Sequence, residues 1–240
     1  MKKIPFILAT CMTLLLTACS GGSSKSTNSI YGDLPEIIEK TENELKKEVR
    51  SMKEKGNMDF ETALGMIVLL KQKVEENTAE SRAKLVGKTL PYELSDSLPY
   101  TIASDITITE VNFTSRGDFL MKAEFDIEIT DSLELSTLGK GLNIYYLLTG
   151  EAGPLYLKNN YCNMKDVKIT QKPDGYGGTW PYWTLAPGDK LHTKISFTAD
   201  DTQVMSLCER LKFIPEKRAK EARNEATNNL KRVLEPTPEK

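Results

Sequence analysis

Hydrophobic and polar residues alternate most regularly between Phe119 and Thr130, where every second residue is apolar. A period of two residues predicts a β-strand with one buried face and one face in water. Shorter apolar runs separated by turn residues predict further strands at 106–113, 142–148, 155–158, 167–171 and 191–198. The alternation therefore indicates a segment rich in short strands.

Two earlier stretches repeat their apolar residues every three or four positions, which is the period of an amphipathic helix. The first begins near Asp33, which with Glu36 matches a capping box, and it ends at Gly56. The second begins after Asp59, a residue type that caps helix starts, and it ends at Gly87. Because the link between them is short, we expect an antiparallel helical hairpin.

The remaining segments complete the predicted architecture. The tripeptide Leu-Pro-Tyr occurs at 90–92 and again at 98–100, and its proline favours extended edge segments. Near the C-terminus, aspartates at 200–201 can cap a short helix, and residues 211–214 suit a brief edge strand. Residues 216–234 form a polar helical pattern with a narrow alanine stripe, which packs on the hairpin or projects freely.

We predict an α+β fold with an N-terminal antiparallel helical hairpin, an immunoglobulin-like antiparallel β-sandwich and a C-terminal helix. The term immunoglobulin-like describes architecture only, because the Cys, Trp, Cys spacing of antibody domains is absent. The predicted organisation has five parts. They are a signal peptide at 1–18, a flexible tether at 19–32, the hairpin at 33–87, the sandwich at 88–215, and the C-terminal helix and tail at 216–240.

The N-terminus carries a targeting pattern. Two lysines precede an apolar run that is too short to span a bilayer, as is typical of a secretory signal. The run ends in Leu16-Thr17-Ala18-Cys19, which resembles the lipobox of bacterial lipoproteins at all four positions. In that family the cysteine thiol carries a diacylglycerol and the chain is cut just before it. The resemblance implies that Cys19 is the lipidated first residue of the mature chain; the alternative is an ordinary signal peptide that contains a cysteine.

Residues 20–29 are rich in serine and glycine, which predicts a flexible tether reaching roughly 17–20 Å. Ser20 rather than aspartate follows Cys19, and in the enterobacterial sorting rule this favours the outer membrane. Surface-exported lipoproteins of some gut bacteria carry acidic residues after the cysteine; this tether has none, which favours a periplasm-facing protein. As a whole the chain resembles uncharacterised lipoproteins of Gram-negative gut bacteria. The membrane, reached through the lipid, is its first expected partner.

Composition and motif content narrow the function. A formal net charge of −2 provides no basic footprint for nucleic acid. The sequence contains no P-loop, no Gly-x-Ser-x-Gly elbow, no zinc-binding His-Glu-x-x-His helix and no clustered cysteines. We therefore expect a non-catalytic protein without a cofactor or metal. A hydrolase with an unrecognised site is the less favoured alternative.

The residues with reactive side chains are few. Cys162 and Cys208 remain in the mature chain, and an oxidising periplasm would let them form a disulfide; otherwise they are two small buried hydrophobic residues. The single histidine, His192, lies on a predicted strand whose alternation points it outward, and a pairing with Cys162 as general base requires a proximity that the sequence does not show. Asp126 and Glu128 share the exposed face of a strand, where carboxylates are more often solubilising than catalytic.

Both tryptophans occur in a glycine-rich stretch that the sequence predicts to be a loop between strands, which contains Tyr176, Trp180, Tyr182 and Trp183. Aromatic rings displayed on a loop can stack on a glycan, a peptide or an apolar tail. Alternatively, the last three rings fold back as a small satellite core. The sequence thus favours a lipid-anchored envelope protein that binds a ligand of unknown identity. A scaffold or accessory subunit of an envelope complex, using the hairpin to contact an envelope protein, is the alternative.

Overall fold

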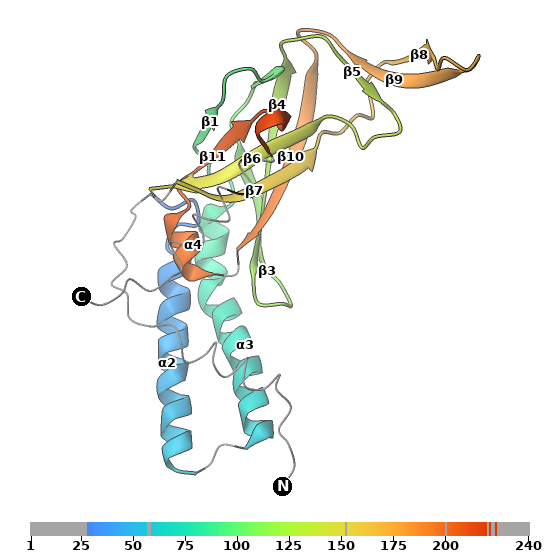
Figure 1. The fold of residues 1–240 in the computed structure, drawn as a ribbon. Coiled ribbons are helices and arrows are strands. Elements are labelled where there is room, and N and C mark those ends of the chain that lie inside the picture. The colour runs from blue at the N-terminus through green and yellow to red at the C-terminus, as the bar shows by residue number, and fades with distance from the viewer. Residues whose placement is uncertain are drawn as a thin grey trace.

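The computed structural model of the chain describes residues 28–56, 59–151, 153–199 and 201–219, together with 221 and 224. Predictions for Cys19, the leader, most of the tether and the end of the C-terminal helix lie outside the described residues. The described part combines helices with several largely antiparallel sheets, so the α+β class is confirmed. A helical hairpin projects from one end of the sheets and a small sheet from the other (Figure 1).

Two antiparallel helices, α2 (Leu34–Glu54) and α3 (Phe60–Leu85), form the predicted hairpin. The side chain of Asp59 caps α3, because it accepts a hydrogen bond from the backbone N–H of Thr62 at 2.8 Å. The capping box predicted at Asp33 is wrong. Its side chain makes no capping hydrogen bond, and its backbone (φ −89°, ψ 0°) lacks the extended conformation of a typical N-cap.

The last residues of the predicted tether are packed against the folded body. The Ser29 hydroxyl donates a hydrogen bond to the Met205 carbonyl at 2.6 Å, and the Ile30 N–H donates to the Cys208 carbonyl at 2.8 Å. Tyr31 is fully buried. Burial of the Ile30 and Tyr31 side chains offsets the entropy cost of ordering this segment. Serine and glycine alone cannot do so. The ordered body therefore begins before the helical pattern does.

The strands form two large sheets and one small sheet. The first large sheet is centred on β4 (Phe119–Ile129), which pairs with β10 (Lys190–Ala199), β3 (Thr107–Phe113) and β2 (Tyr100–Ile102). The second has the order β1 (Tyr92–Leu94), β11 (Arg210–Ile214), β6 (Asn143–Gly150) and β7 (Gly153–Tyr161). The small sheet has the order β5 (Leu133–Ser136), β9 (Thr179–Leu185) and β8 (Ile169–Pro173).

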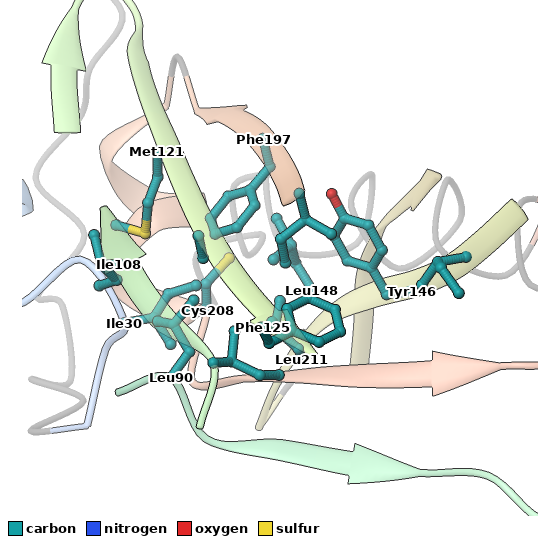
Figure 2. Close-up of a cluster of buried hydrophobic side chains, with 14 of the residues drawn as sticks. Ile30, Leu90, Ile108, Met121, Phe125, Tyr146, Leu148, Phe197, Cys208 and Leu211 are labelled. Carbon is teal, nitrogen blue, oxygen red and sulfur yellow. The ribbon is translucent and has the colours of Figure 1, made fainter. Parts of the chain in front are cut away.

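The two large sheets share one hydrophobic core (Figure 2). As the alternation predicts, β4 buries every odd-numbered residue and leaves the even-numbered residues partly exposed. Phe125 of β4 meets Phe213 of β11 with ring centroids 5.6 Å apart, and Tyr146 of β6 meets Phe197 of β10 at 6.4 Å. Each side chain of this size contributes roughly 1.5–3 kcal/mol when it is fully buried. The core thus joins strands that lie far apart in the sequence.

A short helix, α4 (Thr202–Leu207), joins the hairpin to the sheets by contacting α2 and β10. The carboxylate of Asp201 caps it, accepting hydrogen bonds from the N–H groups of Gln203 and Val204 at 2.8 and 3.3 Å. This cap is the one that the sequence predicts at this position.

The second large sheet differs from the sequence-based expectation in three ways. Strand β11 lies between β1 and β6 and is not an edge strand. It buries both Phe213 and Ile214, whose side chains point to opposite faces, and both faces of this strand are therefore covered. β1 pairs with β11 in parallel, so the sheets are not wholly antiparallel. In the described start of the C-terminal helix, Ala219 packs with Leu147 and Ile214 on this sheet rather than on the hairpin.

Candidate functional site

The aromatic stretch belongs mainly to the small sheet. The prediction of a loop through residue 183 is wrong, because Trp180, Tyr182 and Trp183 lie on β9, which pairs with both β5 and β8. Pro181 is compatible with this central strand. Its carbonyl accepts a hydrogen bond from the Thr137 N–H at 3.2 Å, so the backbone polar groups of Pro181 face the side where β5 has already ended.

The strand alternation separates the aromatic side chains onto two faces of the small sheet. Leu185 is buried, and Trp183 is half-buried against the main core. Trp180 and Tyr182 point to the opposite face, two residues apart, and Trp180 is 43% exposed. The fold-back alternative therefore describes Trp183, whereas Trp180 is exposed and the half-buried Tyr182 shares its face.

Polar side chains border these two rings. Lys172 on β8 is the register partner of Trp180, and its Nζ lies 5.8 Å from the centre of the Tyr182 ring. The same ammonium group forms an ion pair with Glu134 on β5. Trp180, Tyr182, Lys172, Glu134 and the hydroxyls of Thr170 and Thr184 are together called the aromatic face. The two threonine oxygens are 2.7 Å apart.

The turn between β8 and β9 is held by one carboxylate. The Asp174 Oδ1 atom accepts hydrogen bonds from the N–H groups of Tyr176 and Gly178 at 2.8 and 2.9 Å. Tyr176 is 97% exposed at this turn. Of the four aromatic residues that the sequence singles out, it is the one that stays on a loop.

Four members of the aromatic face were not predicted from the sequence: Glu134, Thr170, Lys172 and Thr184. A signal for Lys172 was present, because a hairpin folded about the turn at 174–178 places residue 172 opposite residue 180. Glu134 carried no such signal. Its strand, β5, has only four residues, and its pairing with β9 is not determined by local pattern.

His192 lies on the outer face of β10, as predicted, within a surface network of charges. Its Nδ1 is 3.0 Å from Asp126 Oδ1 and its Nε2 is 3.3 Å from Glu124 Oε2. The Lys194 ammonium, 2.5 Å from Glu124 Oε1, is the main cause that lowers the pKa of that carboxyl group. Glu128 is partly exposed on the same face of β4. The arrangement is a solvated network in which His192 contacts Asp126 and Glu124 within hydrogen-bond distance and Lys194 forms an ion pair with Glu124.

The two cysteines of the described part of the chain, Cys162 and Cys208, lie away from this network. Both Cys162 and Cys208 are buried free thiols, so the disulfide that the sequence left open is not formed in this structure. The Cys162 sulfur faces the hydroxyl group of Thr193. Thr193 directly follows His192 on β10. Successive side chains on a strand point to opposite faces, so the structure does not bring Cys162 and His192 together.

A groove of about 710 Å³ lies beside β1, β11 and the residues that follow β11. Its lining includes Glu93, Asp96, Lys212 and Arg218. Glu93 is already paired with Arg210 at 2.7 Å. Carboxylates and cations of this kind side by side define no single ligand chemistry.

No family model, curated protein or solved structure matches the chain. Among the described residues, no His, Cys, Asp and Glu side chains form a group of three that could hold a metal ion. In that same part of the chain, none of the helices has both the length and the apolar character needed to cross a membrane.

Proposed function

We propose that the chain is a lipid-anchored cell-envelope protein with a non-catalytic binding function, attached at Cys19 to the outer membrane and facing the periplasm. Its ligand-binding surface is the aromatic face of the small sheet. The observation that carries this proposal is that the exposed Trp180 and the half-buried Tyr182 share the outer face of β9, while Trp183 on the same strand packs against the main core. A sheet that served packing alone would gain more by burying all three rings.

The chemistry of the aromatic face favours a glycan as the ligand. The flat C–H surface of a sugar ring stacks on an exposed indole or phenol ring, which offers a large contact area at low entropy cost. Sugar hydroxyls also need hydrogen-bond partners, and Lys172, Glu134 and the two threonine hydroxyls supply them at the border of the rings. The ion pair and the paired threonines hold these groups in place before binding.

Tryptophan fluorescence tests the proposal directly. Titration of the full-length protein with soluble envelope glycan fragments should change the emission of Trp180. The variants Trp180→Ala and Tyr182→Ala should each weaken binding about tenfold or more, as expected when a stacking ring is removed.

Tyr161→Ala is the matched control. Tyr161 is a strand tyrosine that is 40% exposed, and Lys140 Nζ lies 5.7 Å from its ring centre, close to the 5.8 Å between Lys172 Nζ and the Tyr182 ring. This variant should bind glycan normally. Equal losses in Tyr161→Ala and Tyr182→Ala, or binding of extended peptides in place of glycans, would contradict the proposal.

We also infer that the two large sheets form a sandwich of immunoglobulin-like architecture. The shared core between them and the long antiparallel pairing of β4 with β10 support this inference. The parallel pairing of β1 and β11 is a departure from that architecture.

A further inference from the structure

The first turns of α3 carry a row of exposed apolar side chains. Phe60, Leu64 and Val68 are 54%, 46% and 65% exposed. They are spaced four residues apart and therefore lie on one side of the helix. These three residues are called the apolar stripe. A helix that is apolar on more than one side normally has more than one neighbour.

The side of α3 opposite the apolar stripe contacts α2. Lys73 Nζ is 3.4 Å from Glu48 Oε1, and the Asn77 side chain donates a hydrogen bond to the Thr41 hydroxyl at 3.0 Å. Residues 73 and 77 lie roughly half a turn away from residues 64 and 68 around the helix. The apolar stripe therefore faces away from its partner helix.

On the side of the apolar stripe, the first large sheet covers only the later turns of α3. Arg82, five turns after Leu64, has its Nη1 3.5 Å from the Val111 carbonyl of β3. Lys71, two turns after Leu64, donates a hydrogen bond to the Ser115 carbonyl at 3.0 Å, in the turn between β3 and β4. Figure 1 shows that this turn reaches only part of the way along α3. The apolar stripe begins where this cover ends.

Two cationic side chains lie at that boundary. Lys71 is one, and Arg116, which is exposed in the turn between β3 and β4, is the other. The turn touches Lys71 closely, since a Cβ atom at Gly117 would lie 3.4 Å from the Lys71 Cε atom. The same boundary also carries two carboxylates, the exposed Glu75 one turn after Lys71 and Asp118, which accepts a hydrogen bond from the Thr114 hydroxyl. An apolar row that ends beside cations suits an anionic lipid surface.

The connection to the lipid anchor brings a membrane within reach of this surface. Nine residues separate Cys19 from Ser29, which is fastened to Met205 at the base of the hairpin. A flexible chain of that length has an r.m.s. reach of roughly 15–18 Å and a maximum of about 30–33 Å. The 21 residues of α2 are about 32 Å long. The hairpin can therefore lie along the bilayer to which its base is tethered.

The small size of the apolar stripe favours a lipid bilayer over a protein partner. Three side chains cannot supply the ~800 Å² per partner that a stable protein interface buries. A tethered surface has an effective concentration in the millimolar range, so a small apolar contact suffices. We propose that the apolar stripe, with Lys71 and Arg116, docks the hairpin on the surface of an anionic bilayer. This inference rests on the proposed lipid anchor.

A site-specific fluorophore tests the inference on the full-length protein reconstituted in vesicles of phosphatidylglycerol and phosphatidylethanolamine. A polarity-sensitive dye on Leu64→Cys should shift to the blue, and the same dye on Leu138→Cys should not. Leu138 is a matched control because it is 74% exposed and lies between β5 and β6. The native cysteines at 162 and 208 are buried, so they should not take up the dye. The protein without an introduced cysteine, treated with the same dye, measures any uptake at Cys11 or Cys19.

Substitutions test each part of the surface. Val68→Glu should lower the ratio of docked to undocked protein about tenfold by removing apolar contact. Arg116→Gln should lower it about fivefold, and only when anionic lipid is present. Leu138→Glu should leave the ratio unchanged.

Fatty-acid labelling of the same preparations keeps the two proposals apart. If the protein takes up fatty acid but the dye at position 64 responds no more than the dye at 138, the inference is overturned and the proposed anchor is retained. An unlabelled protein whose dye at position 64 still responds supports the lipid contact and contradicts the anchor. Sedimentation without vesicles tests protein assembly instead. If Leu64→Glu has a lower mass than the unchanged protein, or loses a bound partner, the apolar stripe serves protein assembly and the inference is overturned.

Discussion

The sulfur atom of Cys162 lies 3.3 Å from the hydroxyl oxygen of Thr193, inside the core of the large sheets. Burial raises the pKa of this thiol to about 11 and that of Cys208 to about 12, above the ordinary value of 9.0. Neither thiol is a thiolate at neutral pH while the protein is folded.

The free energy of unfolding should fall as the pH rises from about 9 to 11. A thiol whose pKa is raised by folding stabilises the native state below its unfolded pKa, and this contribution is lost as the pH climbs toward the folded value. Urea unfolding at pH 8 and pH 10 measures the loss. Cys162→Ala should lose less stability between these two pH values than the unchanged protein. An equal loss would contradict a raised pKa of the Cys162 thiol.

The two tryptophans should differ in their effect on stability. Trp183→Ala should lower the free energy of unfolding by about 2 kcal/mol, because it opens space against the main core. Trp180→Ala should change it by less than about 0.5 kcal/mol, as expected for an exposed residue. Chemical denaturation of both variants makes the comparison. A larger loss in Trp180→Ala would mean that the aromatic face is packed rather than displayed.

Two aspartates that precede helices should respond differently to substitution. Asp201→Ala should cost about 1 kcal/mol, because its carboxylate accepts two backbone hydrogen bonds at the start of α4. Asp33→Ala should have little effect, since its side chain makes no capping hydrogen bond. Thermal unfolding monitored by circular dichroism compares them. Similar losses in both variants would contradict the difference in capping.

Gly150→Ala should be strongly destabilising. A Cβ atom at this position would lie 1.6 Å from the Leu207 carbonyl oxygen, which is backbone and cannot move aside cheaply. We expect a loss of about 3 kcal/mol or more, the range of severe backbone and packing defects. Gly65→Ala on α3 is the control, because a Cβ atom there meets nothing within 4 Å. It should be neutral or stabilising by up to about 1 kcal/mol. Expression level and the urea midpoint report both effects.

The sequence was most informative where structure depends on local pattern. The alternation along β4 predicted its two faces, and Asp59 and Asp201 predicted helix starts that the structure confirms. The outward direction of His192 followed from the alternation along its own strand, β10. In each case the deciding neighbours lie within a few residues.

The parts that were missed depend on distant segments. Whether Thr179–Leu185 forms a strand depends on β5, which lies more than 40 residues earlier in the chain. From the sequence alone, the glycines and proline around this stretch favour a loop, because its partner strand β5 is not apparent. The interior position of β11 similarly depends on β1 and β6. The composition of the aromatic stretch was visible in the sequence, but its division into an inward and an outward face was not.

The hydrogen bonds at Ser29 and Ile30 determine how the molecule would bear mechanical load. Tension on the N-terminal segment would reach these bonds to Met205 and Cys208 before it reached α2. Force would therefore enter at the junction of α4 and β11, beside the main core, and the hairpin would lie outside the direct load path. A protein joined in this way would bear tension on its N-terminus without loading the small sheet, which lies at the far end of the molecule (Figure 1).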